Sequence, residues 1–155
     1  MKYYLSEYWA MMQSRETRDE ALNKWYAASE EYYKYFDTIK DKLPKNFINL
    51  YNKNDGFHDS IIKKISIENM RLKSCEVKFT LRINEVDYIL AYKNVIGFEV
   101  DIPPEENGLF GWGYDELELL DNGYFEHRIL CDINSEFKIT FKKLSIKKVT
   151  GEANV

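Results

Sequence analysis

Acidic side chains dominate one stretch of the sequence. Between Asn94 and His127 the chain carries nine acidic residues and no Lys or Arg. A block of one charge sign repels itself, so in a folded domain it indicates either local compensation or attraction of an oppositely charged partner. The stretch surrounds a loop, residues 103–113, that contains two prolines and three glycines. This stretch is therefore the first candidate for a binding site.

Strand-like alternation selects four acids from this stretch. Acidic positions alternate with apolar ones before and after the loop, which predicts two strands with their acids on a solvent-facing side. These acids are Glu99, Asp101, Glu116 and Glu118. If the two strands pair, the carboxylates repel one another by on the order of a few tenths of a kcal/mol per pair. Either a basic partner relieves this repulsion or basic residues of neighbouring strands do so: Lys78, Arg82, Arg128 or Lys138.

The loop itself carries Leu109, Phe110 and Trp112 between its glycines. Large apolar and aromatic side chains often anchor protein partners, so these three residues are candidates for a protein-binding site, unless they tuck under the end of the sheet. The glycines do not follow a strand and open a helix, and Glu105 and Glu106 would repel phosphate. A nucleotide-binding loop is therefore not expected.

A His-Asp pair, His58 and Asp59, lies where the helical half of the chain gives way to strands. Such a pair could bind a divalent metal or transfer protons. The only other histidine, His127, is predicted to face inward, so a metal site of His58, Asp59 and His127 requires the fold to bring them together. The simpler interpretation is that the Asp59 side chain accepts hydrogen bonds from backbone N–H groups of a turn, while the His58 ring packs against its neighbours. We expect neither a metal nor a cofactor.

The first third of the chain is predicted to be helical. Ser6 can cap a short helix through Met12, and Thr17 with Glu20 forms a capping-box pattern that opens a longer helix ending before Pro44. An aromatic stripe at three- and four-residue spacing runs along the longer helix and predicts a core-facing side. Its members are Leu22, Trp25, Tyr26, Ser29, Tyr32, Tyr33, Phe36, Ile39 and Leu43.

From Ile61 onward the apolar period changes to two. The alternation covers 75–83, 96–102, 125–131 and 137–141, and Asn122-Gly123 is the strongest hairpin signal. Helices followed by half-buried strands predict an α+β fold, with N-terminal helices packed on an antiparallel meander sheet of six to eight strands. We expect a single domain over 1–155, with a helical part at 1–56, a β part at 57–150 and a tail at 151–155.

Composition narrows the functional classes. The chain has 155 residues and a formal net charge of −4. This charge argues against a nucleic-acid partner, because phosphate binding needs clustered Lys and Arg residues. No apolar run is long enough for a signal peptide or a membrane span, so no membrane partner and a cytoplasmic location are expected. Cys75 and Cys131 fall on apolar strand positions and are interpreted as small buried hydrophobic residues.

Several segments together resemble a known family. They are the aromatic-rich N-terminal helix, Leu43-Pro44, Phe57-His58-Asp59-Ser60, the Glu-Leu-Glu-Leu-Leu run at 116–120, Asn122-Gly123 and the run at 124–130, Tyr-Phe-Glu-His-Arg-Ile-Leu. Over nearly the whole chain they resemble a family of Bacillus-type cytosolic proteins classed as a domain of unknown function. The start of the sheet at His58-Asp59 is also similar to immunity proteins of bacterial toxin systems. The family resemblance implies no activity and no site residues.

The sequence leads to three functional hypotheses, the third of which is a structural or housekeeping domain with no discrete site. The first is a non-enzymatic protein-binding domain, of the immunity type, that inhibits a basic toxin through its acidic face and aromatic loop. The second is a small metal-dependent or acid-base enzyme centred on His58 and Asp59. Nucleophilic catalysis is not expected, because the sequence has no G-x-S-x-G motif and no Cys-His arrangement.

Overall fold

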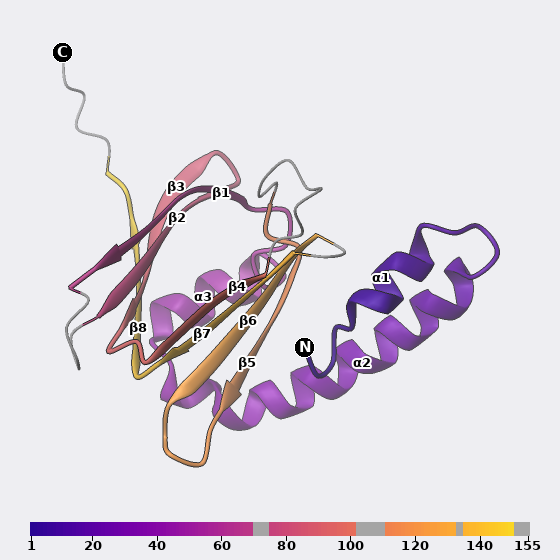
Figure 1. Ribbon diagram of the computed structural model, residues 1–155, viewed down its shortest axis with the longest axis horizontal. Helices are drawn as coiled ribbons and strands as arrows, with labels where there is room; N and C mark the ends of the chain where they lie inside the picture. Colours follow the sequence, from indigo (N-terminus) through magenta and orange to yellow (C-terminus); the bar gives the residue numbers. More distant parts are fainter. Residues whose placement is uncertain (70–74, 102–110, 133–134, 151–155) are drawn as a thin grey trace.

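Helices occupy the first third of the chain and strands the rest, in a computed structural model that describes residues 1–69, 75–101, 111–132 and 135–150 (Figure 1). The helices are α1 (Ser6–Met12), α2 (Arg18–Ile39) and α3 (Lys45–Lys53), with a 3₁₀ turn η1 (Lys40–Lys42) after α2. The strands are β1 (Ile61–Glu68), β2 (Glu76–Ile83), β3 (Val86–Lys93), β4 (Gly97–Asp101), β5 (Tyr114–Leu119), β6 (Phe125–Asp132), β7 (Ser135–Phe141) and β8 (Lys143–Lys148). The predicted α+β class is confirmed.

The strands form two antiparallel sheets of four rather than one continuous sheet. One sheet has the order β1-β2-β3-β8 and the other β4-β7-β6-β5. The chain changes sheet between β3 and β4 and returns between β7 and β8, where Lys142 alone separates the strands. At the far edges the backbone of Ser60, before β1, pairs with that of Trp112, before β5. This bridge ties the outer strands of the two sheets together at one end.

Aromatic side chains fill the space between the sheets. Phe79 of β2 meets Phe137 of β7 edge to face at 5.4 Å, and Tyr92 of β3 meets Phe141 of β7 at 5.0 Å. Burying one such ring contributes about 1.5–3 kcal/mol relative to leaving it in water. The alternation that predicted β2 is confirmed, because its inward positions, Val77, Phe79, Leu81 and Ile83, are all buried. In β4 it fails at Val100, which is 47% exposed on the edge of its sheet.

The aromatic stripe of α2 packs against the edge of a sheet. Trp25, Tyr32 and Phe36 are buried, whereas Tyr26 is 67% exposed, so the buried stripe is narrower than the sequence indicated. The Tyr32 hydroxyl accepts a 2.8 Å hydrogen bond from the N–H of Leu117, and the Tyr35 hydroxyl accepts one of 2.9 Å from that of Leu119. These tyrosines satisfy backbone groups on the open edge of β5, which would otherwise be free to pair with another strand.

The short helix α1 lies beside the N-terminal half of α2, beyond the strands (Figure 1). Thr17 does stand at the start of α2, but its hydroxyl donates to the carbonyl of Met11, at 2.8 Å, and makes no capping bond. The aromatic ring of Trp9 reaches the main body over Gly113, where an added Cβ would lie only 2.5 Å from the ring. Gly113 therefore allows α1 to dock closely.

Two further expectations are checked by the fold. Cys131 is buried as predicted, whereas Cys75 is partly exposed just before β2. Among the helices of the described ranges, none combines the length and the apolar character that a membrane crossing requires.

Candidate functional site

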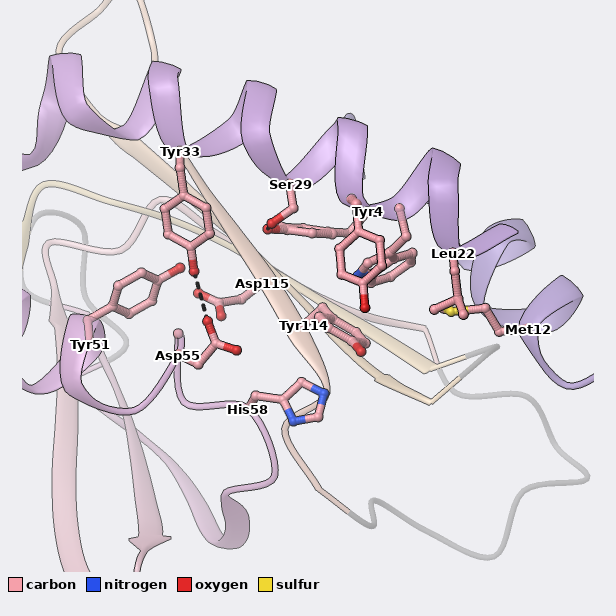
Figure 2. Close-up of a pocket in the computed structure, with 13 residues that line it drawn as sticks. Tyr4, Met12, Leu22, Ser29, Tyr33, Tyr51, Asp55, His58, Tyr114 and Asp115 are labelled. Carbon is pink, nitrogen blue, oxygen red and sulfur yellow. Dashed lines mark hydrogen bonds between the residues drawn. The ribbon is translucent and has the colours of Figure 1, made fainter. Parts of the chain in front are cut away.

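A pocket of about 220 Å³ opens where the N-terminal helices meet the sheet that contains β5 (Figure 2). Its walls come from the segment before α1, from α1 and α2, from the end of α3 and the loop after it, and from the start of β5. Segments far apart in the sequence therefore meet at one hollow, as ligand sites commonly require. We describe it as the helix–sheet pocket.

One wall of the helix–sheet pocket is a cluster of three aromatic rings. Tyr4 lies 5.1 Å from Trp25 of α2, and Trp25 lies 4.3 Å from Tyr114 of β5, measured between ring centres. The Tyr4 hydroxyl donates to Oγ of Ser29 at 3.0 Å, which fixes the ring of Tyr4 against α2. Because the rings contact one another, this wall is rigid and its ring faces are largely covered.

The opposite wall carries hydroxyl and carboxyl groups. The Tyr33 hydroxyl donates to Oδ1 of Asp55 at 3.3 Å, and Figure 2 shows this pair beside Tyr51 at one end of the pocket. The Tyr51 hydroxyl lies 3.3 Å from that of Tyr32, so one of the two donates to the other. This end of the pocket is rich in oxygen atoms that can accept hydrogen bonds.

The floor of the pocket is Asp115, which is only 4% exposed. Its Oδ1 accepts a hydrogen bond of 3.1 Å from the indole N–H of Trp112, and its Oδ2 lies 2.6 Å from Nε2 of His127. The other ring nitrogen of His127, Nδ1, lies 2.9 Å from the Tyr92 hydroxyl. A buried chain of polar groups thus runs from Tyr92 through His127 to Asp115.

The hydrogen bonds of His127 to Tyr92 and Asp115 indicate which of its ring nitrogens carries the proton. With the proton on Nε2, the imidazole donates to Asp115 and its Nδ1 accepts from the Tyr92 hydroxyl, so every polar hydrogen has an acceptor. In this arrangement His127 holds the Asp115 carboxylate in place through Oδ2. The three linked side chains therefore orient the carboxylate of Asp115 at the pocket floor.

Gly56 brings the loop after α3 close to Asp115. Its φ of +68° is a conformation that glycine adopts easily, and a Cβ there would lie 3.1 Å from Oδ1 of Asp115. The same Cβ would lie 3.3 Å from the Tyr51 hydroxyl. Both the backbone conformation and the space thus favour glycine where the loop crosses the carboxylate.

The phenols around the pocket are held in their neutral form. Burial raises the pKa of Tyr4 to about 12 and raises the pKa values of Tyr33 and Tyr51 as well, with the charge of Asp115 adding to each shift. Burial likewise raises the pKa of Tyr114. The pocket therefore presents neutral hydroxyls beside the carboxylates of Asp55 and Asp115.

His58 lies at this pocket but apart from the other histidine. Its Nδ1 is 3.0 Å from Oδ2 of Asp59, whose side chain is 89% exposed, and its ring packs 4.6 Å from that of Tyr114. Both ring nitrogens of His127 are engaged by other groups. The alternative metal site of His58, Asp59 and His127 is therefore wrong, and within the described part of the chain no group of three His, Cys, Asp or Glu side chains could hold a metal.

The four predicted carboxylates do not form one patch, because β4 and β5 lie at opposite edges of their sheet. Glu99 forms an ion pair of 2.7 Å with Lys138 of β7, and Arg128 of β6 stands opposite both Lys138 and Glu116. Two bases thus lie between the two acids in one cross-strand row. The charge of Glu99 is therefore compensated by a neighbouring basic residue, which is the alternative raised from the sequence. Asp101 remains exposed and Glu118 is partly buried.

Glu116 is buried, in contrast to the solvent-facing position expected from alternation. It is 5% exposed, and its carboxylate accepts hydrogen bonds from the backbone N–H groups of Lys2, Tyr3 and Tyr4. The prediction failed because the N-terminal segment covers this position, a contact between residues more than a hundred positions apart. Glu116 therefore anchors that segment.

Trp112 is also placed differently from the expected exposed anchor. It is fully buried, its indole bonds to Asp115, and its ring packs against Phe57 and Phe79. Leu109 and Phe110, the other two members of the proposed aromatic anchor, lie outside the described residues. Trp112 supports the pocket floor instead.

Sequence reasoning missed Asp115, although a signal was present. Asp115 shares the inward-facing parity of Leu117 and Leu119 on β5, so it is an acid at a core position. The Asn122-Gly123 hairpin places Leu117 opposite His127, which brings Asp115 within diagonal reach of that histidine on the same face. An inward acid diagonal to an inward histidine predicts a buried pair.

Comparison with known proteins places the chain in a family. The model of a family described as protein of unknown function (DUF4085) matches residues 4–141, which include the N-terminal helices, β1 to β7 and every residue of the helix–sheet pocket. No curated protein matches the chain. The chain therefore belongs to the DUF4085 family of unknown function.

Proposed function

We propose that the protein is a non-enzymatic binding domain whose partner inserts a positively charged group into the helix–sheet pocket. The observation that supports this most directly is the buried carboxylate of Asp115, which faces an aromatic-walled hollow. The described residues that line the pocket include no Lys or Arg. A carboxylate in a water-poor site attracts a cation more strongly than an exposed acid does, because the local dielectric is lower.

The partner in this proposal is a basic protein, and the domain acts in the cytosol as an immunity-type inhibitor of a basic toxin. The net charge of −4 and the exposed acids at the pocket mouth, Asp55 and Asp59, favour approach of a basic surface. The sheet face with Glu99 and Asp101 remains a second proposed contact surface, weakened by the Glu99–Lys138 pair.

Affinity capture followed by measurement with the purified partner tests this function. Proteins retained by the immobilised domain are identified by mass spectrometry, and the binding of each is then measured at low and high salt. We expect a basic partner whose affinity falls with salt. Asp55→Asn should weaken its binding, because the exposed rim carboxylate would attract the approaching cation.

A matched variant distinguishes the two surfaces. Replacing Glu99 by Gln and Asp101 by Asn removes two exposed acids from the sheet face and leaves the pocket intact. If this double variant loses the partner while Asp55→Asn retains it, the contact surface is the sheet face. A partner whose binding is indifferent to salt and to both variants would contradict the proposal.

An acid-base enzyme remains the second candidate, because His58 and Asp59 do pair at the pocket mouth. In that case a bound small ligand would be chemically changed with time. Nuclear magnetic resonance of the ligand during incubation would detect the change, and His58→Gln would stop it while leaving initial binding in place. A ligand that stays unaltered for many hours with the native domain would rule out this candidate.

A further inference from the structure

The arrangement of hydrogen-bond acceptors in the helix–sheet pocket narrows the kind of cation that fits. A carboxylate offers about four lone-pair sites. Among the described residues, two donors reach Asp115: the Trp112 indole on Oδ1 and His127 on Oδ2. Each oxygen therefore keeps acceptor capacity. Gly56 lets the backbone of its loop pass close to these acceptors, because a Cβ there would lie 3.1 Å from Oδ1 of Asp115 and 3.3 Å from the Tyr51 hydroxyl.

Further acceptors lie around the same hollow. Ser29 Oγ, the Tyr33 and Tyr51 hydroxyls and the Asp55 carboxylate all line the pocket, and raised pKa values keep the phenols neutral. An alkylammonium group carries three N–H donors and no acceptor, which complements a site of oxygen acceptors with one buried charge. The charge of Asp115 repels anions from the same position.

Other cations fit less well. A guanidinium binds a carboxylate best through two parallel hydrogen bonds, one to each oxygen, and the Trp112 indole and His127 already occupy one of the two lone pairs on each oxygen of Asp115. A quaternary ammonium needs open aromatic faces, whereas Tyr4, Trp25 and Tyr114 cover one another. A compact ammonium requires neither a fork nor an open ring face.

The other end of the pocket suits an alkyl chain. Figure 2 shows Met12 of α1 and Leu22 of α2 at the opposite end of the pocket from Asp55 and Tyr51. The pocket volume of about 220 Å³ is below the roughly 300–1,000 Å³ typical of drug-sized ligands. The space therefore matches one extended side chain or a small amine.

We propose that the helix–sheet pocket binds a primary alkylammonium group, with Asp115 as its counter-charge and with Met12 and Leu22 along its alkyl chain. This inference deepens the binding function proposed above and rests on it. The ammonium belongs either to a lysine side chain of the partner protein or to a free alkylamine, since both present the same chemistry.

Titration with small probes of equal chain length tests the inference. Butylamine, butylguanidine, butyltrimethylammonium and butanol are added in turn to the full chain, and the resonances of pocket residues are followed by nuclear magnetic resonance. We expect butylamine to bind at least about tenfold more tightly than each of the other three, a difference of about 1.4 kcal/mol. Equal binding of butanol or butylguanidine overturns the proposal.

Variants of the pocket sharpen the test. Asp115→Asn should reduce butylamine affinity at least about tenfold, whereas Asp41→Asn, at an exposed carboxylate that does not line the pocket, should change it little. If Asp115→Asn does not fold, Leu22→Trp fills the alkyl end without touching the charge and should also abolish binding. Butylamine affinity that survives Leu22→Trp, or survives Asp115→Asn in a folded protein, overturns the proposal.

Two outcomes separate this inference from the proposed function. If a basic protein partner binds but butylamine neither binds nor competes with it, the ammonium assignment is wrong and the binding function stands. If butylamine binds as expected but no basic protein does, the ammonium site stands and the protein-binding function is wrong. Nα-acetyl-lysine methylamide represents a lysine side chain of a protein, and putrescine represents a free amine. Binding of the first but not the second would identify a protein side chain as the source of the ammonium group. Binding of putrescine alone would identify a free amine.

Discussion

His127 supports the charged floor of the pocket through both of its ring nitrogens. Replacing it by Leu removes the Nε2 donor from Asp115 and the acceptor from the Tyr92 hydroxyl, in a place closed to water. Leaving a buried donor or acceptor without its partner costs about 1–3 kcal/mol, and more when the group is a carboxylate. We expect His127→Leu to lower the free energy of unfolding by about that amount, as measured by urea denaturation at neutral pH.

The exposed Asp59 provides the comparison for this variant. Asp59→Asn keeps a residue that tolerates the positive φ at this position and removes only a solvated charge. Its effect on unfolding should stay within about 0.5 kcal/mol. Similar losses in both variants would mean that the Tyr92–His127–Asp115 chain contributes no particular stability.

Asp87 predicts an acid-sensitive contribution on the other sheet. Hydrogen bonds from Arg82 and then Lys63 lower the pKa of its carboxyl from 3.8 to about 2. Because the folded pKa lies below the unfolded one, this contribution is present above pH 4 and is lost as the pH falls from about 4 to 2. Asp87→Asn should flatten that part of the stability curve, measured as denaturation midpoints in this pH range. If the denaturation midpoints of Asp87→Asn fall between pH 4 and 2 as they do in the native protein, Asp87 does not make this contribution.

At the scale of elements, α2 closes the edge of β5 with tyrosine hydroxyls. Tyr32→Phe leaves the buried N–H of Leu117 without its partner, whereas Tyr35→Phe affects Leu119, which is only partly buried. A buried unsatisfied donor costs about 1–3 kcal/mol. We therefore expect Tyr32→Phe to destabilise the fold more than Tyr35→Phe, and amide hydrogen exchange at Leu117 to accelerate in the first variant.

These two substitutions remove the same atom from neighbouring tyrosines of one helix, so each serves as the control for the other. If both lower stability equally and leave the exchange of Leu117 unchanged, the hydroxyls do not protect the β5 edge.

The elements that could be predicted are those with a local signal. The period of two in β2 follows from which neighbours face the core, and Val77, Phe79 and Leu81 are buried as that period indicates. The division into two sheets depends on the pairing of β3 with β8 and of β4 with β7. No local pattern encodes such long-range partners, so a single meander was the simplest expectation.

The site was harder to predict than the fold for the same reason. Glu116 is buried because the segment from Lys2 to Tyr4 covers it. The pocket forms because Tyr33, Asp55 and Asp115 meet from three segments far apart in the sequence. Periodicity assigns a face to each residue but does not show which other segment covers that face. Asp115 and His127 were the exception, because one hairpin register relates them.

At the scale of the whole molecule, buried tyrosines predict sensitivity to alkali. Burial raises the pKa of Tyr4 to about 12 and raises the pKa values of Tyr32, Tyr51 and Tyr92. A raised phenol pKa stabilises the fold fully below pH 10, and that contribution is lost as the pH rises through the folded value. We expect the buried tyrosines to ionise together with cooperative unfolding, followed by tyrosinate absorbance and by circular dichroism.

Two phenylalanine variants test whether buried tyrosines cause this loss of stability at alkaline pH. Tyr4→Phe should reduce the loss of stability between pH 10 and 12, whereas Tyr26→Phe, at a 67% exposed position, should not. Ionisation of all twelve tyrosines near pH 10 in a protein that remains folded would contradict the expectation.

The bond between Tyr32 and Leu117 spans 85 positions of the chain, which affects how the protein is made. At a synthesis rate of roughly 5–20 residues per second, α2 leaves the ribosome about 4–17 s before the strand that receives its hydroxyls. During that interval Trp25, Tyr32 and Phe36 have no sheet to cover them. We therefore expect the newly made N-terminal half to expose apolar surface that a chaperone would cover until the strands emerge.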